Sequence, residues 1–135
     1  MRSYLKEAAS DRGLKKISAD LRIGANSYLK GKTVVVEEKV KIGDNTVIDS
    51  DDLFIGRNTV IGDDNVFIAP LRFKVGRNSV IGSRNRCRCR RFEAGDFLFM
   101  ENNIEVGGGG SLEPHSEFKI GDYCMICNGC YINTS

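Results

Sequence analysis

An apolar residue recurs at about every sixth position along most of this chain. Glycine directly follows six of these ten residues, and asparagine stands three places after three of them. A repeat this short and this regular constrains the possible folds more than any other feature of the sequence. The repeated apolar residues are Ile42, Ile48, Ile55, Ile61, Ile68, Val75, Ile81, Ile120, Ile126 and Ile132.

The period fits neither a helix nor a sheet of hairpins. A helix needs apolar residues three and four places apart, and hairpin strands alternate between turns about 8–12 residues apart. A period of six fits a very short strand and a tight bend, where glycine and asparagine are expected to supply positive φ. Stacking such units places each apolar side chain over its equivalent in the next coil. The sequence therefore predicts an all-β fold, a parallel β-helix with three hexads per triangular coil. The alternative is a jelly roll or sandwich with accidental spacing.

The first residues lack the regular repeat and predict a cap for the solenoid. Ser3 can cap a short amphipathic helix that ends near Gly13. We therefore divide the chain into residues 1–35, an N-terminal helical cap with a first irregular coil, and residues 36–135, the β-helix. At the other end a repeat begins and stops at Ser135. An uncovered coil edge is unusual, so we expect further sequence or a partner there.

Four repeats resemble the hexapeptide-repeat acyltransferase family, and the resemblance covers about residues 40–135. The stretch 104–133 is similar to the central coils of the sugar and small-molecule acyltransferases of that family. The resemblance implies a left-handed parallel β-helix, a homotrimer, and an acyl-CoA or carrier-protein thioester as donor. It also implies a histidine that acts as general base on a hydroxyl or amine of a small acceptor such as a sugar. The four repeats are Ile42-Gly-Asp-Asn-Thr-Val, Ile55-Gly-Arg-Asn-Thr-Val, Val75-Gly-Arg-Asn-Ser-Val and Ile120-Gly-Asp-Tyr-Cys-Met.

His115 is the one histidine of the chain and so the one candidate for that base. It lies between repeats, where Glu113 and Glu117 could orient its ring, although such a residue is more often a solvated surface histidine. The resemblance implies that the catalytic histidine stands in coils beyond a segment like 131–135. The base can then come from His115, from further sequence or from a partner. The alternative function is a non-catalytic scaffold or assembly module that associates through its open end.

A cationic band interrupts an otherwise acidic chain. Residues 72–91 hold eight basic residues and no acidic one. Within this band four arginines alternate with other residues, so a strand would place their guanidinium groups on one face and two cysteines, Cys87 and Cys89, on the other. The candidate donor-binding residues are Arg84, Arg86, Arg88 and Arg90.

This ladder suits the phosphates of coenzyme A, which would be a substrate and not a tightly bound cofactor. The alternatives are a solvated edge and an edge that pairs with the acidic body of a neighbouring subunit. Nucleic acid is a weaker expectation, because no aromatic residue is interleaved with the arginines.

The cysteines are assigned to the core rather than to a metal. Cys124, Cys127 and Cys130 have a spacing like that of metal ligands, but the repeat places their thiols on different sides of the coil. We therefore predict no metal site. Five cysteines without a signal segment favour reduced thiols and a cytoplasmic protein, and no apolar run is long enough for a membrane span.

Overall fold

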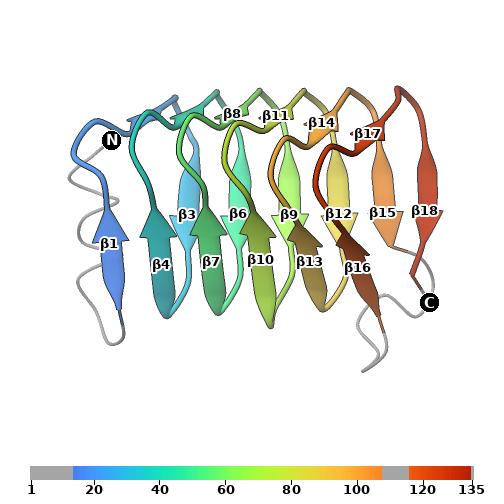
Figure 1. Cartoon of the computed structure of the whole chain (residues 1–135), viewed down its shortest axis with the longest axis horizontal. Coiled ribbons are helices and arrows are strands. Elements are labelled where there is room, and N and C mark those ends of the chain that lie inside the picture. Colours follow the sequence, from blue (N-terminus) through green and yellow to red (C-terminus); the bar gives the residue numbers. More distant parts are fainter. Residues whose placement is uncertain (1–13, 108–115, 135) are drawn as a thin grey trace.

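The computed structural model describes residues 14–107 and 116–134, and this part of the chain is a stack of short parallel strands (Figure 1). Eighteen strands form three six-stranded sheets, and each coil contributes one strand to each sheet in turn. No helix is present among the described residues, and so none that could cross a membrane. The predicted parallel β-solenoid is confirmed, whereas its left-handed winding and the boundary at residue 35 stay predictions. The expected N-terminal helix lies outside the described residues.

The three sheets form the three walls of the solenoid. Sheet A contains β1 (Lys15–Ile17), β4 (Thr33–Val36), β7 (Asp52–Ile55), β10 (Arg72–Val75), β13 (Arg91–Ala94) and β16 (Glu117–Ile120). Sheet B contains β2 (Arg22–Ile23), β5 (Lys41–Ile42), β8 (Val60–Ile61), β11 (Val80–Ile81), β14 (Phe99–Met100) and β17 (Met125–Ile126). Sheet C contains β3 (Tyr28–Lys30), β6 (Val47–Asp49), β9 (Val66–Ile68), β12 (Arg86–Arg88), β15 (Glu105–Gly107) and β18 (Tyr131–Asn133).

Each coil is slightly longer than three hexads. Equivalent residues of successive coils are 19 or 20 positions apart, and 26 apart across the coil that includes segment 108–115. One extra residue arises because most sheet A strands, such as β7, have four residues. The second extra residue of the 20-residue coils lies in the bend 69–71 between β9 and β10, since the bend between β6 and β7 has only residues 50–51. The longer strands account for the spacing of seven between Ile48 and Ile55.

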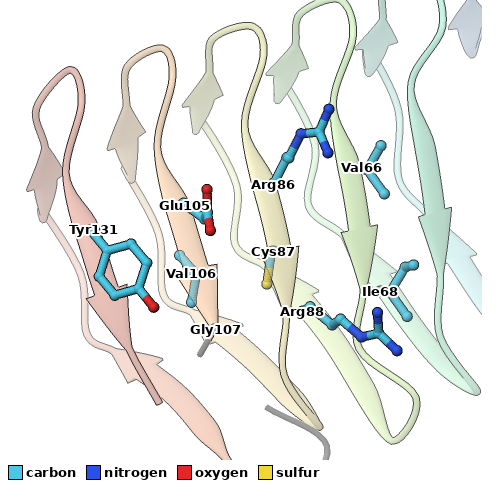
Figure 2. Close-up of a pocket in the computed structure, with 9 residues that line it drawn as sticks. All are labelled: Val66, Ile68, Arg86, Cys87, Arg88, Glu105, Val106, Gly107 and Tyr131. Carbon is cyan, nitrogen blue, oxygen red and sulfur yellow. The ribbon is translucent and has the colours of Figure 1, made fainter. Parts of the chain in front are cut away.

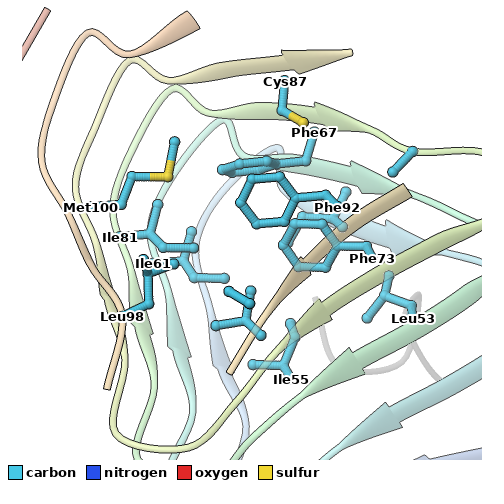
Figure 3. Packing of buried hydrophobic residues seen from close by; sticks show 14 of the residues in the cluster. Leu53, Ile55, Ile61, Phe67, Phe73, Ile81, Cys87, Phe92, Leu98 and Met100 are labelled. Carbon is cyan, nitrogen blue, oxygen red and sulfur yellow. The ribbon is translucent and has the colours of Figure 1, made fainter. Parts of the chain in front are cut away.

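The core is a column of apolar side chains inside the three walls. In sheet B, Ile61 lies in register between Ile42 and Ile81, and all three are buried. Figure 3 shows Phe67, Phe73 and Phe92 packed together across from this column. The ring centroids of Phe73 and Phe92 are 5.3 Å apart, in a stacked arrangement. The predicted stacking of apolar residues from coil to coil is therefore confirmed for most of the repeat.

The inward position of Ile68 was predicted incorrectly. Phe67 stands in register with Ile48 and is fully buried, whereas Ile68 pairs with Asp49 and lies half-buried on the outer face of sheet C. Side chains of a strand alternate between faces, so a shift of one residue exchanges the two. The large phenyl ring takes the inward position, where it contacts the rings of Phe73 and Phe92 at 5.1 and 5.7 Å between centroids.

The repeated glycines do not serve the purpose that was predicted for them. The asparagines do adopt positive φ, with 53° at Asn45 and 63° at Asn58. The two described glycines with positive φ, however, are Gly107 and Gly129, neither of which follows a repeated apolar residue. The repeated glycines instead allow neighbouring coils to approach closely. A Cβ atom on Gly56 would lie 2.4 Å from the backbone nitrogen of Arg77 in the next coil.

Gly56→Ala is therefore expected to destabilise the solenoid by about 1–3 kcal/mol, because the backbone of the next coil must move to admit a methyl group. Urea unfolding followed by circular dichroism measures this change. Gly121→Ala is the matched control, since no described atom lies within 4 Å of a Cβ built there. Its stability is expected to change by less than about 0.5 kcal/mol. Equal effects of the two substitutions would contradict the close-approach explanation.

Candidate anion-binding site

The arginine ladder is centred on the short strand β12 in sheet C. Burial alternates along it: Arg86 and Arg88 are exposed on the outer face, and Cys87 and Cys89 are buried on the inner face. The prediction that the thiols and guanidinium groups lie on opposite faces is confirmed for these four residues. The alternation arises because successive side chains of a strand point to opposite sides of the sheet.

The other two arginines of the ladder lie outside the strand. Arg84 is in the preceding turn, with φ of 58°, and its Nε donates a hydrogen bond to Asn103 Oδ1 at 3.1 Å. Arg90 is half-buried in the bend between β12 and β13. The structure therefore brings Arg86 and Arg88 together on one outer face and does not bring Arg84 and Arg90 into the same group.

A hollow of about 420 Å³ lies on the outer face of sheet C beside these two arginines (Figure 2). Its outer walls come from two rows of side chains that cross β9, β12, β15 and β18. In one row Arg86 is in register with Val66 and Glu105, and Glu105 with Tyr131. In the other row Arg88 is in register with Ile68. The complete lining is Val66, Ile68, Arg86, Cys87, Arg88, Glu105, Val106, Gly107 and Tyr131.

The positive charge at the hollow comes from the guanidinium groups of Arg86 and Arg88. On sheet A, ion pairs join Arg72 to Glu93 at 3.4 Å and Arg91 to Glu117 at 3.6 Å. Within residues 14–107 and 116–134, neither Arg86 nor Arg88 belongs to an ion pair. A guanidinium group presents several N–H donors in a plane, which match the oxygens of a phosphate or carboxylate. One carboxylate, that of Glu105, stands on the strand next to Arg86 and limits the net positive charge.

The inner face behind the ladder is occupied by two thiols. The Sγ atoms of Cys87 and Cys89 are 3.5 Å apart, and Cys89 Sγ donates to the backbone oxygen of Arg91 at 3.1 Å. Burial raises the pKa of the Cys87 thiol, and the hydrogen bond with Cys87 lowers the pKa of the Cys89 thiol. The prediction that both residues fill the core is confirmed.

The other sequence candidates do not add ligands to this hollow. Cys124 and Cys130 pack partly buried against the core, whereas Cys127 is exposed, so the predicted core position is wrong for Cys127. Among the residues that the structure describes, no group of three His, Cys, Asp or Glu side chains is placed to hold a metal ion. His115 lies outside the described residues, so its role as a base stays a prediction.

Sequence reasoning missed the part of the hollow that comes from other coils. The sequence did not link Glu105 or Tyr131 to the arginines, although Glu105 lies one coil and Tyr131 two coils after Arg86. The signal that could have found them is the coil length, since residues 19 or 26 positions apart are neighbours on one face. Comparison of the chain with family models, with curated proteins and with solved structures gives no match. The family resemblance therefore rests on the repeat itself.

Proposed function

We propose that the chain is a module of an acyltransferase that binds a phosphorylated acyl donor, acyl-CoA, on the outer face of sheet C. The observation that carries the proposal is the pair of exposed guanidinium groups, Arg86 and Arg88, beside a hollow of about 420 Å³. Small-molecule sites are commonly clefts of about 300–1,000 Å³ with a few placed polar groups. The resemblance of the repeats to hexapeptide-repeat acyltransferases supports the reaction class.

The lining of the hollow suits a ligand with both anionic and apolar parts. Arg86 and Arg88 are two residues apart on β12, so their guanidinium groups can bind neighbouring phosphate oxygens. Val66 and Ile68 on β9 offer an apolar surface on one side, and Tyr131 on β18 offers an aromatic ring on the other. Coenzyme A combines a diphosphate with an adenine ring and a less polar arm, and these parts match the three kinds of surface.

In the proposed reaction a hydroxyl or amine of a small acceptor, such as a sugar, attacks the thioester carbonyl. The C–S bond breaks, the coenzyme A thiolate leaves, and a general base takes the proton of the acceptor. His115, further sequence or a partner would supply that base. Coenzyme A enters and leaves as a substrate, so no tightly bound cofactor is required. The left-handed winding, the homotrimer and the cytoplasmic location implied by the resemblance or by composition belong to this proposal.

Replacing Arg86 and Arg88 together by serine is expected to weaken coenzyme A binding at least tenfold. The reason is that two charge-assisted interactions of about 1.5–3 kcal/mol each are lost. Isothermal titration calorimetry with coenzyme A measures the affinity, and the melting temperature should stay nearly unchanged because both side chains are exposed. Binding by the parent should also weaken as salt is raised.

The control removes the same charge from other walls of the solenoid. Arg57→Ser with Lys119→Ser changes two exposed cations, one on a turn and one on sheet A. This control is expected to leave coenzyme A affinity within about twofold, because neither side chain lines the hollow. No binding of coenzyme A to the parent, or equal losses in the two double variants, would remove the donor site and favour the scaffold alternative.

A further inference from the structure

Two thiols lie together on the inner side of sheet C, directly behind the arginines of the hollow. The Sγ atoms of Cys87 and Cys89 are 3.5 Å apart, and both residues are free cysteines. Arg88 stands between them in sequence, and its side chain lines the hollow on the opposite face of the sheet (Figure 2). The hollow and the thiol pair therefore share one short piece of backbone.

Packing of the solenoid does not require a thiol at either position. In the row of inward side chains that includes Cys87, the neighbouring coils carry Phe67 and Val106. Two coils before Cys89, the equivalent corner position is Ser50, which follows the strand residue in register. Its Oγ donates to the backbone oxygen two residues ahead at 3.2 Å, as the Sγ of Cys89 does at 3.1 Å. The fold therefore accepts residues other than cysteine at both places.

A small movement would bring the two sulfur atoms to bonding distance. A disulfide needs about 2.05 Å between them, so each sulfur has to move by less than about 1 Å. Alternate residues of an extended strand are about 6.6 Å apart at Cα, near the upper limit for a disulfide. Cys89, however, lies beyond the end of β12, in the bend that leads to β13. Its backbone can therefore approach Cys87 without loss of the strand itself.

We propose that Cys87 and Cys89 form a reversible oxidation site, in which hydrogen peroxide closes a disulfide around Arg88. The thiolate of Cys89 attacks one oxygen of the peroxide, the O–O bond breaks, and the hydroxide that leaves takes up a proton to become water. The sulfur of Cys87 then attacks the resulting sulfenic sulfur, the S–O bond breaks, and a second water leaves with the thiol proton. The two thiols lose two electrons and two protons, and the peroxide is reduced to two water molecules.

The surroundings of the two thiols support this order of attack. The hydrogen bond with Cys87 lowers the pKa of the Cys89 thiol, whereas burial raises the pKa of the Cys87 thiol. The thiolate is the form that reacts with peroxide, so Cys89 is the first nucleophile. Both side chains are buried, and the oxidant must therefore be small and enter when the bend after β12 opens locally. Hydrogen peroxide is little larger than water and meets this condition.

The expected consequence for the hollow rests on the proposed function. Drawing Cys87 and Cys89 together bends the backbone at Arg88 and turns its guanidinium group away from that of Arg86. One of the two charge-assisted contacts with the donor phosphates is then lost, which should lower coenzyme A affinity about tenfold. Disulfides in reducing compartments are usually transient and redox-sensing, so the bond would act as a reversible control of donor binding.

Intact mass spectrometry of the folded full chain after peroxide treatment tests the proposal. The other three cysteines, none of which is fully buried, are first replaced by serine so that they form no competing bonds. We expect the loss of two hydrogens, recovery of the original mass with dithiothreitol, and a peptide in which Cys87 and Cys89 are joined. Two matched controls should fold and show no such loss: Cys89→Ser, which copies Ser50, and Cys87→Val, which copies Val106.

Several results would overturn the proposal. One is a folded chain that stays reduced in millimolar peroxide, and another is oxygen added to Cys87 or Cys89 without a bond between them. Calorimetry with coenzyme A on the reduced and oxidised forms then tests the link to the hollow, and equal affinities would overturn that link. If the reduced parent binds no coenzyme A, the donor site itself fails, while the mass measurement still decides whether the disulfide forms.

Discussion

Replacing Ile61 by aspartate is expected to abolish cooperative folding. Ile61 is 1% exposed and lies between Ile42 and Ile81 in the column of sheet B side chains. The substitution removes about three buried apolar carbons and introduces a group that must be buried either as an ion or as an unpaired acid. The cost is several kcal/mol in either form. Because a domain of this size is stable by only about 5–15 kcal/mol, this loss removes most or all of its stability.

Thermal melting followed by circular dichroism measures this effect, and the adjacent residue provides the control. Val60 is on the same strand but points outward and is 41% exposed, so Val60→Asp keeps its carboxylate in water. It is expected to cost about 1 kcal/mol or less, which reflects the poor fit of aspartate to a strand. A melting curve of Ile61→Asp that resembles the parent's would contradict the inward register of the repeat.

The architecture could be predicted from sequence because one physical rule is repeated in every coil. Ile42, Ile61 and Ile81 each occupy an equivalent place, so the pattern is averaged over many coils and survives local irregularity. The inward residue of a single strand could not be fixed in the same way. Phe67 and Ile68 are both apolar neighbours, and the choice between them depends on how the phenyl ring fills the interior against Phe73 and Phe92.

The function of the glycines illustrates a second limit of sequence reasoning. Glycine is favoured both by positive φ and by close approach of another backbone, and the sequence pattern is the same for both. At Gly56 the distance to the next coil decides in favour of close approach. Asparagine leaves less ambiguity, because it has a side chain and is common in turns for its tolerance of positive φ. The predicted positive φ is accordingly found at Asn45 and Asn58.

The candidate site could be predicted where it is local in sequence and not where it is assembled from several coils. Arg86 and Arg88 follow from alternation along a single strand. Tyr131 reaches the same hollow from a strand two coils later, and its place depends on the coil length of 26 residues that includes segment 108–115. Without the number of residues per coil, the sequence does not indicate which residues of later coils stand beside the arginines.

Replacing Asn85 by leucine is expected to destabilise the chain by about 3–4 kcal/mol. Asn85 is fully buried at a corner of the solenoid, where its Nδ2 donates to the backbone oxygen of Glu101 at 2.9 Å. Its Oδ1 accepts a hydrogen bond from the backbone nitrogen of Ile104 at 2.8 Å. Leucine has a similar size but would leave one backbone donor and one backbone acceptor without partners. Each unpaired buried group costs about 1–3 kcal/mol.

The coil structure itself provides the control for this prediction, because threonine performs the same task two coils earlier. At Thr46, Oγ1 donates to Gly62 O at 2.7 Å and accepts from the backbone nitrogen of Asn65 at 3.3 Å. Asn85→Thr should therefore retain both kinds of hydrogen bond and cost about 1 kcal/mol or less, which urea unfolding can separate from the leucine variant. If leucine and threonine destabilised the chain equally, the loss of stability would come from the change in packing volume. The side-chain hydrogen bonds of Asn85 would then not account for the stability of this corner.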